Sequence, residues 1–591
     1  MTTVIRLLGR PVIEVAGRPG PAPRGNKTWA VLAFAALCDQ PPARQRVAEL
    51  LFADAADPLG ALRWVLAELR RAVGHSVLSG DPLRLELPAG TTLDLLEPQD
   101  GQPSGELLAG LRFRGCESFE TWLLVERRRL TSASVSRLRE AGLQALGAGR
   151  AEQSARIAAT LVELEPLQDA HHTLLARALT VAGHHRQARQ SVENCESLFL
   201  RELGSPPSRQ VREALRASPG SPSAPALGGA AAATAQLTAG TAAISAGAVA
   251  AGIDCLRRAV DEARYAEDES LLADALAELG AALVHSVRGR DEEGASTLHE
   301  ALHHARAARS PVKTAIYREL AFVDVQAGRG EQAESWLIRA RDLATRHGDD
   351  RQLAAIDGVA GMNHSDQADY PGALALLTDS VDRALRSDSR RQAAWSASLI
   401  GRLHLLRGDY DHARAALRQS LDLVETERWV AFLPWPTSLR AEIDRIEGHT
   451  GTAVRQLQET FALSCQLADP CWEGTSRRSL ALCYPTDPAQ VLEGLLDAQA
   501  RCNRWPDTYQ WIHAFILDSI CDQAAKTGHP GALGYADELL SLAAQANLRE
   551  YIVRAHVHRA HLGQPGAATA AQVAVTAIDN PQLAHAVATT R

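Results

Sequence analysis

The sequence predicts a mainly α-helical protein, in which an N-terminal winged helix (α+β) precedes an α-helical domain and a long α-solenoid. Three observations support this fold class. Short β-rich segments cluster in the first hundred residues, nearly everything after Glu106 has helical periodicity, and a small residue recurs every 39 or 40 positions in the second half. At 591 residues the chain is too long for one hydrophobic core, so several domains are expected.

Composition excludes several classes of protein. The longest apolar run, Trp29 to Cys38, is about half of the ~20 residues that a transmembrane helix needs, and no signal peptide opens the chain. The nine cysteines include no Cys-x-x-Cys pair, which indicates reduced thiols and not a zinc framework. We therefore expect a cytoplasmic protein without membrane contact, metal or cofactor. The formal net charge of -8 confines any DNA binding to a local module.

The N-terminal region shows strand and helix patterns in the order of a winged helix. The expected elements are strands at 5–9 and 12–15, helices at 28–37, 44–52 and 58–73, and a half-buried strand at 83–87. A Gly-Arg-Pro turn separates the first two strands and predicts an antiparallel pair. Strands, three helices and a closing hairpin together make a winged helix, which is a variant of the helix-turn-helix.

The second half contains an internal repeat of about forty residues. Its positions are Gly289, Gly328, Ala368, Gly408 and Gly448, followed five residues later by Gly294, Ala333, Ala373, Ala413 and Ala453, and four residues after those by Leu298, Leu337, Leu377, Leu417 and Leu457. The first small residue starts a tight turn between antiparallel helices, the second lets the helices approach closely, and the leucine fills the core. This pattern resembles tetratricopeptide repeats. Gly528 suggests that the same repeat spacing continues beyond Pro488. Gly149 and Gly183, which are 34 residues apart, are expected to make the same kind of turn between helices in the earlier domain.

Two groups of motifs follow each other in the first 215 residues. The first group comprises residues 7–9 (LLG), 24–27 (RGNK), 45–52 (QRVAELLF) and 61–71 (ALRWVLAELRR), and the second comprises 119–129 (FETWLLVERRR) and 199–208 (FLRELGSPPS). In this order they resemble the DNA-binding domain of the antibiotic regulatory protein (SARP) family and the bacterial transcriptional activator domain that follows it in that family. The order is more specific than either group alone.

The resemblance implies an activator that binds promoter repeats in double-stranded DNA and contacts RNA polymerase. It implies an activator domain packed on the winged helix, and a homodimer is among the expected assembly states. The predicted domains are a winged-helix DNA-binding domain at 1–97, the activator domain at 104–215, a Ser/Pro/Gly/Ala-rich linker at 216–240 and a tetratricopeptide-like array at 241–591.

Seven basic side chains are the candidates for DNA contact. Leu62, Leu66, Leu69 and Val73 form the expected buried stripe of the third helix, and Arg63, Arg70 and Arg71 fall off this stripe, where they could reach the major groove. Lys27, Arg44 and Arg46 on the earlier helices and Arg84 in the wing are candidate phosphate contacts. The alternative is that each is an ordinary solvated cation.

Some features depart from the family. The third helix carries Val65, Ala67 and Glu68 where basic or polar residues are usual, and a glutamate facing phosphates is repulsive. Residues 1–100 contain eleven basic and eleven acidic residues, whereas a DNA-binding domain usually carries excess positive charge. The alternative function is therefore a degenerate regulator that acts as a protein-interaction scaffold without sequence-specific DNA binding.

The sequence lacks an ATPase motif, and the one pattern that suggests enzymatic chemistry has a simpler explanation. None of the three lysines is preceded by glycine, so no phosphate-binding Gly-Lys-Thr loop and no ATPase module are predicted. His299-Glu300-Ala-Leu-His303 matches the zinc-protease HExxH pattern, with Glu319 as a conceivable third ligand. Because the motif overlaps the core leucines of one repeat, we expect an ordinary repeat helix and no catalytic residue.

Tryptophans mark a candidate binding surface in the array. Trp395, Trp435, Trp472 and Trp511 could line a groove for an unknown protein, peptide or apolar ligand, with Arg391 and Arg402 as polar contacts. The alternative, which we favour, is that these side chains pack between repeats. The sequence identifies no ligand.

Overall fold

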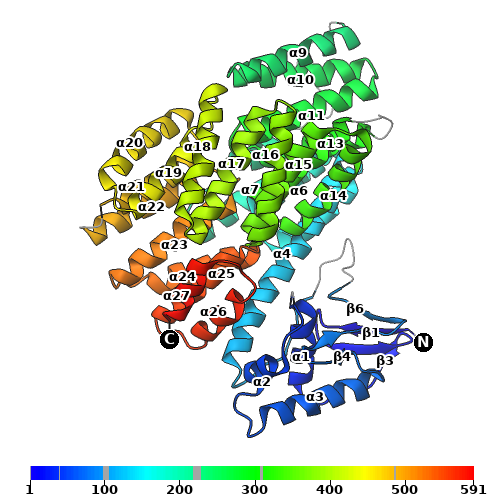
Figure 1. The fold of residues 1–591 in the computed structure, drawn as a ribbon. Helices are drawn as coiled ribbons and strands as arrows, with labels where there is room; N and C mark the ends of the chain where they lie inside the picture. The colour runs from blue at the N-terminus through cyan, green and yellow to red at the C-terminus, as the bar shows by residue number, and fades with distance from the viewer. Residues whose placement is uncertain are drawn as a thin grey trace.

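The computed structural model describes residues 2–38, 40–96, 105–216, 228–305, 311–484 and 487–590. Within these ranges the fold is mainly α-helical, as predicted, with 27 α-helices and two small sheets near the N-terminus, one of four strands and one of two (Figure 1). In the same part of the chain, no helix combines the length and the apolar character needed to cross a bilayer.

The first domain has the elements of a winged helix. They are β1 (Thr3–Arg6), β2 (Val12–Val15), β3 (Arg18–Pro19), α1 (Asn26–Leu37), α2 (Arg44–Phe52), α3 (Pro58–Val73), β4 (Leu78–Ser79), β5 (Arg84–Leu85) and β6 (Thr91–Leu93). The main sheet has the order β3-β2-β1-β6, with β1 antiparallel to β2 and parallel to β6, while β4 and β5 form the wing hairpin. Helices α2 and α3 have the predicted bounds.

Two strands are shorter than predicted, for identifiable reasons. Strand β1 ends at Arg6 because the N–H groups of Leu7 and Leu8 donate to the carboxylate of Asp94, each at 2.9 Å, instead of continuing the ladder. The predicted strand at 83–87 is reduced to two residues. Its first N–H, that of Leu83, donates to the carbonyl oxygen of Pro42 at 2.8 Å and leaves the hairpin.

A 31-residue helix, α4 (Glu117–Gly147), connects the winged helix with the rest of the molecule (Figure 1). Its first turns pack on the winged helix, where the rings of Trp122 and Phe34 lie 5.0 Å apart in an edge-to-face arrangement. The remaining helices of this domain are α5 (Ala151–Leu164), α6 (Asp169–Val181), α7 (His185–Leu203) and α8 (Arg209–Glu213). Gly149 and Gly183 take left-handed conformations at the predicted helix-to-helix turns.

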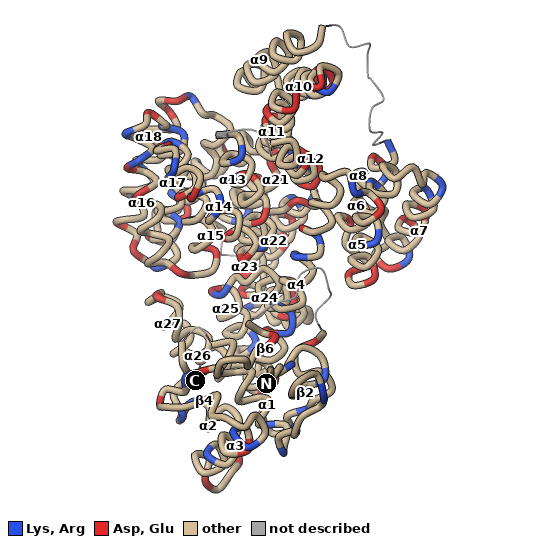
Figure 2. Tube along the Cα trace, turned by 90° about the vertical axis from the view of Figure 1, so that its right-hand side faces the viewer, with Lys and Arg blue, Asp and Glu red and all other residues tan. Residues whose placement is uncertain are grey.

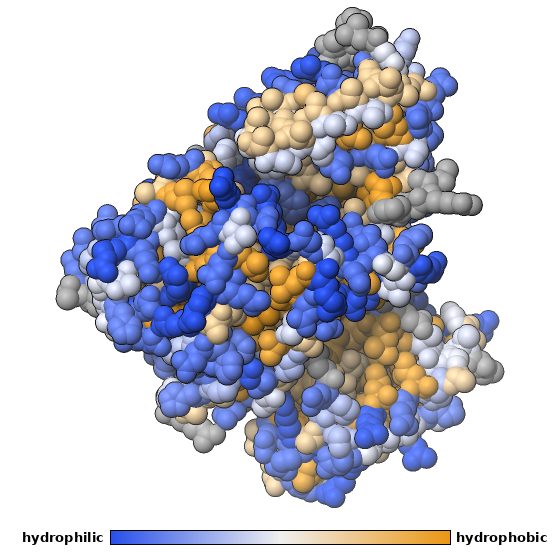
Figure 3. Space-filling model, turned by 45° about the horizontal axis from the view of Figure 1, so that its top comes forward, coloured by the Kyte–Doolittle hydropathy of each residue, from blue (hydrophilic) through white to orange (hydrophobic). Residues whose placement is uncertain are grey.

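The array that follows is a series of antiparallel helix pairs. Its helices are α9 (Ala230–Ser245), α10 (Val249–Tyr265), α11 (Glu269–Ser286), α12 (Asp291–His304), α13 (Pro311–Gln326), α14 (Gly330–His347), α15 (Asp350–Asp366), α16 (Tyr370–Arg386), α17 (Arg390–Arg407), α18 (Tyr410–Thr426), α19 (Pro434–Ile446), α20 (Thr450–Leu467), α21 (Pro470–Leu482), α22 (Pro488–Cys502), α23 (Gln510–Lys526), α24 (Ala532–Gln545), α25 (Arg549–His561), α26 (Ala567–Val575) and α27 (Pro581–Ala588). On the face of the molecule that Figure 3 shows, polar residues cover most of the surface, and many of the apolar residues lie in recesses.

The linker was predicted too long at its C-terminal end. It was placed at 216–240, but α9 begins at Ala230 and packs against α10. The alanines between Ala230 and Ala233 are strong helix formers, and the composition that suggested a linker also suits a helix once a neighbour buries one face. Residues 217–227 of the predicted linker lie outside the described residues.

The predicted repeat is present in the structure. All five turn residues have positive φ, from 61° at Ala368 to 86° at Gly448, so each ends its helix in the left-handed region. The small residues and leucines that follow are buried, as expected for the interface inside each helix pair. Gly361 and Gly401 each lie against the leucine of the partner helix, where a Cβ atom would approach the side chain to about 2.5 Å. Gly528 makes the same turn between α23 and α24, and Pro488 begins α22.

The array closes on itself around α4. Helices α12 and α14 near its start and α24 and α26 near its end all contact α4. Early turns also meet late helices directly, through Asp291 and Asp507, Gly328 and Ala546, Tyr370 and Glu550, Leu406 and Asn580, and Arg407 and Asp579. The C-terminal helices therefore fill space that would be an open groove in an extended solenoid.

Candidate nucleic-acid interface

Helix α3 has sharply defined ends and one exposed face. Its N-cap Asp57 accepts a hydrogen bond from the Gly60 N–H at 2.8 Å, and Gly74 ends the helix with a φ of 85°. The helix lies at the end of the molecule farthest from α9, with the array on the other side of the winged helix (Figure 1). Val65, which appeared to be an apolar substitution on the DNA-facing side, is in fact buried in the core.

The three candidate arginines of α3 differ in their partners. Arg63 is exposed and pairs with Asp57 at 3.3 Å on a face where both groups are open to solvent. Arg70 is also exposed, and no carboxylate in the described part of the chain pairs with it. Arg71 is anchored, because its guanidinium binds Glu68 at 2.9 Å and the carbonyl oxygen of Ala22 at 3.3 Å. Exposed pairs such as that of Arg63 contribute little free energy, so a phosphate can compete for this side chain.

Glu68 is turned toward protein groups instead of solvent. Its side chain is only 12% exposed, and its carboxylate accepts hydrogen bonds from Arg71 and from the backbone N–H of Arg24. The hydrogen bond from Arg71 is the main cause of a lowered Glu68 pKa. Glu68 therefore holds the segment before α1 onto α3, and its negative charge is locally balanced.

The remaining candidates have structural partners as well. Lys27 lies 3.6 Å from Asp54 and over the ring of Phe52, and the Arg44 Nε donates to the carbonyl oxygen of Gly80 in the wing at 2.8 Å. Arg46 faces the C-terminal end of the chain, where it binds Val573 and Thr576. Arg84 is exposed on β5. Arg46 is thus withdrawn from the surface that could meet DNA.

Sequence reasoning missed three exposed residues near α3. Arg24 lies beside Glu68 and Arg71, and its place in the RGNK motif was the only signal for it. Trp64 is 52% exposed and Leu59 is 40% exposed, so the free face of α3 is partly apolar. Figure 2 shows basic residues along α3 and beside β2, interspersed with acidic ones. The interface is consequently mixed in character and not a continuous basic patch.

The HExxH residues do not converge on one point. His299 is buried between α12 and α4, with its Nε2 3.2 Å from a carboxylate oxygen of Glu140. Glu300 instead pairs with Arg264, and Glu319 binds His285 and Arg318. The motif residues are thus distributed over separate contacts between helices, which explains them without a metal.

The candidate tryptophan groove is not open at two of its four positions. Trp435 and Trp511 are almost completely buried, with ring centroids 6.2 Å apart, and Trp472 packs on Trp435 at 5.2 Å. Arg402, expected to serve as a polar contact, is also buried. It lies over the Trp511 ring and bonds to Asp366 at 2.7 Å and to Tyr509 at 2.8 Å. These aromatic residues form core packing, because Trp511 of α23 packs on Trp435 and is itself covered by Tyr551 of α25.

Trp395 stands apart from this cluster. Its half-buried ring lies 6.2 Å from that of Phe322 in α13, two helix pairs earlier, and the second candidate arginine, Arg391, lies over the ring of Trp429. The expected aromatic ladder is therefore divided between separate contacts.

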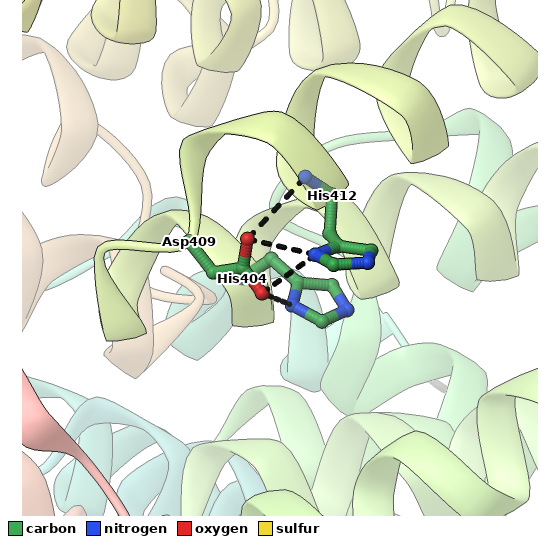
Figure 4. A group of neighbouring side chains, drawn as sticks. All are labelled: His404, Asp409 and His412. Atoms are coloured by element: carbon green, nitrogen blue, oxygen red, sulfur yellow. Dashed lines mark hydrogen bonds and ion pairs between the residues drawn. The ribbon is translucent and has the colours of Figure 1, made fainter.

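Among the residues that the structure describes, two groups of side chains have a donor set that could hold a metal ion. In the first, shown in Figure 4, His404 and His412 both direct Nδ1 at Asp409, at 3.3 Å and 2.8 Å. Asp409 is the N-cap of α18 and already accepts from the His412 N–H, which accounts for the cluster as a helix cap. In the second group, Arg414 binds both Asp444 and Glu447 and occupies the place of a cation.

The fold and its exposed helix define a winged-helix protein with a closed helical-repeat array. Two family models match the sequence: the bacterial transcriptional activator domain over residues 104–217 and the tetratricopeptide repeat over residues 352–426. The chain therefore contains an activator domain and tetratricopeptide repeats, a combination consistent with a SARP-type transcriptional regulator. No curated protein matched the sequence.

Solved structures give only distant similarities. A Rap protein complexed with competence and sporulation factor has 13% identity and a TM-score of 0.32, covering 70% of this chain and 99% of its own. Aspartyl phosphate phosphatase F from Bacillus subtilis has 8% identity and a TM-score of 0.38, covering 70% and 94%. Mycobacterium tuberculosis EmbR, in complex with a low affinity phosphopeptide, has 19% identity and a TM-score of 0.27, covering 36% and 64%. Similarity this low does not identify a ligand or a function.

Proposed function

We propose that the protein is a DNA-binding transcriptional activator whose winged helix binds repeated promoter sequences through α3. The observation that carries this proposal is the exposed face of α3 at the free end of the molecule, with Arg63 and Arg70 directed away from the core. A helix presented in this way can enter the major groove, where arginine donates to guanine and to flanking phosphates.

The basic residues differ in their expected roles. Arg63 and Arg70 would contact bases or phosphates, and Arg84 and Arg24 would contact phosphates on either side. Arg71 would position α3 through its ion pair with Glu68. The other three candidates, Lys27, Arg44 and Arg46, would act by holding the winged helix together and onto the array.

The presence of an activator domain supports the expectation that the protein, once bound to promoter DNA, contacts RNA polymerase. Binding to direct promoter repeats would also favour two copies on neighbouring sites, because each copy presents a single α3. The helical array would then transmit a signal to the winged helix, since helical repeats have no chemistry of their own.

A protein-interaction scaffold is the second candidate. Two observations favour it: Leu59 and Trp64 are exposed on the face of α3 that would meet DNA, and the first hundred residues carry no net charge. Exposed aromatic residues are enriched in protein–protein interfaces, whereas specific DNA binders usually carry excess positive charge.

Fluorescence anisotropy with the full-length protein and labelled DNA from its own upstream region separates these functions. Sequence-specific binding that Arg70→Ala weakens by about 1–3 kcal/mol would support the activator. Arg346→Ala, an exposed arginine on α14, is the charge-matched control. Binding no tighter than that of unrelated DNA at low salt would refute the activator, and loss of a co-purifying protein in Trp64→Ala would then support the scaffold.

A further inference from the structure

A cavity of about 380 Å³ lies where the winged helix, α4 and the C-terminal helices meet. Its walls include Phe34 and Arg46 from the winged helix, Trp122 and Val125 from α4, and Ile552 and His556 from α25. Such a volume is within the range of small-molecule sites in proteins. Because all three parts of the molecule contribute walls, a ligand here would touch each of them at once.

The polar groups of this cavity favour an anion. Arg46 donates two hydrogen bonds to a carbonyl oxygen and a hydroxyl group, so among the described residues no carboxylate balances its charge, and its Nε is buried without a partner. His556 is 2% exposed, and its Nδ1 is also buried without a partner. Glu126 is the one acidic residue among the described walls, and it is paired with Arg129 at 2.9 Å. Unsatisfied buried polar atoms are costly, and a ligand with acceptor oxygens would satisfy them.

Further polar side chains, among them Arg129, Asn547 and Arg549, line the cavity, and another part of its wall is apolar. Phe34, Trp122, Val125 and Ile552 present aromatic and aliphatic carbon to the cavity, with Phe34 and Val125 otherwise buried. Burial of a ligand's apolar body against these side chains supplies affinity, while a few polar groups fix its orientation. A bare inorganic ion would leave this part of the wall without a partner.

From this arrangement we infer that the cavity binds a small organic acid with an apolar body, whose acidic group binds between Arg46 and His556. The ligand would join the winged helix to the C-terminal end of the array. Control of DNA binding by such a ligand would rest on the proposed function, whereas the binding site itself does not.

Two related dyes test the site in the full-length protein without DNA. 8-Anilinonaphthalene-1-sulfonate carries an acidic group on an apolar body, and N-phenyl-1-naphthylamine is the same body without the acid. We expect saturable fluorescence enhancement by one equivalent of the sulfonate and at least about tenfold weaker binding of the neutral dye, because a hydrogen bond to a charged group contributes about 1.5–3 kcal/mol.

Substitutions in the cavity test whether the dyes bind there. Arg46→Gln should weaken the sulfonate about tenfold and leave the neutral dye unchanged, while Arg44→Gln, two residues earlier but bonded inside the winged helix, should change neither. Ile552→Trp should fill the cavity and abolish both signals, and Ala574→Phe does the same from α26 if the first variant does not fold. Equal affinity for both dyes, a signal that does not saturate, or binding unaffected by Arg46→Gln and the filling variants would overturn the inference.

Discussion

Arg46 of α2 donates a hydrogen bond to the carbonyl oxygen of Val573 in α26 at 2.8 Å, and a second one to the Thr576 hydroxyl at 3.1 Å. The winged helix is therefore held from two directions: α4 continues it in sequence, and α26 returns to it from the far end of the chain. A change in the packing of the last helices would reach α2 through a direct contact.

Removal of this contact should loosen the C-terminal helices. We expect Arg46→Ala to accelerate hydrogen–deuterium exchange in α2 and in residues 567–577, because about 1–3 kcal/mol of hydrogen bonding at the junction is lost. Mass spectrometry of the exchanged full-length protein measures this. Arg44→Ala, whose side chain bonds to Gly80 within the winged helix, should leave α26 unchanged. Unaltered exchange in α26 of Arg46→Ala would contradict a role for this contact.

Neutralising Glu68 should strengthen non-specific DNA binding. Glu68→Gln keeps the shape of the side chain but leaves Arg71 without a carboxylate partner, so the α3 face gains one positive charge. If α3 faces the phosphates, the slope of the logarithm of the binding constant against the logarithm of the salt concentration should become more negative by about 0.9, the value for one additional phosphate contact. Anisotropy titrations with an unrelated duplex at several salt concentrations measure the slope.

The matched control changes the same charge elsewhere in the domain. Glu14→Gln removes the partner of Arg6 on the β1–β2 hairpin and should leave the slope unchanged. Equal slopes for Glu68→Gln and the wild type would argue that α3 does not face the phosphates.

Local signals made the elements of the winged helix predictable. Helix α3 has the predicted bounds because Asp57 and Pro58 start it and Gly74 ends it, and all three act within one turn of the helix. The turns of the array were likewise predictable, because an abrupt reversal between helices needs a residue that tolerates positive φ. Such signals depend on neighbours in sequence.

Contacts between distant segments left no comparable signal. The same tryptophan spacing suits an open groove or a packed core. Trp435 is buried because Trp511 of α23 packs on it, and Trp511 is covered in turn by Tyr551 of α25. For the same reason, Arg46 was expected to contact phosphate, although α26 binds it from 527 positions away. Periodicity specifies which residues share a helix face but not which distant helix covers it.

A pair of glycines tests whether the array is closed. Gly328 and Gly448 occupy the same turn position in different repeats, with φ of 74° and 86°. Alanine at Gly448 meets no atom within 4 Å, so Gly448→Ala measures conformational strain alone, about 1–2 kcal/mol. At Gly328 a Cβ atom would lie 2.8 Å from the Cα of Ala546, at the end of α24. Gly328→Ala should therefore lower the free energy of unfolding by distinctly more than Gly448→Ala.

Chemical denaturation of both variants measures the difference between their free energies of unfolding. This difference tests whether the turn at Gly328 contacts the end of α24. A third variant, Ala368→Gly, relieves positive φ at the equivalent position and should be neutral to stabilising, since the strain it removes offsets the lost methyl group. Equal losses for Gly328→Ala and Gly448→Ala would show that the array opens in solution.

The last prediction concerns a half-buried acidic pair, Asp291 and Asp507, where the array closes. Asp507 accepts a hydrogen bond from the Asp291 N–H at 2.9 Å, and burial, reinforced by the charge of Glu292, raises the pKa of Asp507 to about 6. A carboxyl group with a raised pKa in the folded state contributes stability that is fully present below its unfolded pKa of about 3.8, and this stability is lost as the pH rises through about 6. The ionised group is thus a cost to the folded protein at neutral pH.

Asp507→Asn removes this cost and keeps an oxygen that can accept the Asp291 N–H. The variant should be more stable than the wild type at pH 7.5, by about 3 kcal/mol, and the gain should shrink toward pH 4.5. Burial lowers the pKa of His171 and His556 to about 4, so both proteins lose stability as the pH falls from 6.5, and this loss cancels in their difference. Denaturant unfolding at both pH values, with exposed Asp382→Asn as control, measures the gain. A gain of equal size at both pH values would show that the gain does not come from the ionisation of Asp507. A loss at pH 7.5 would mean that Asp507 is stabilised as a carboxylate where the two ends of the array meet.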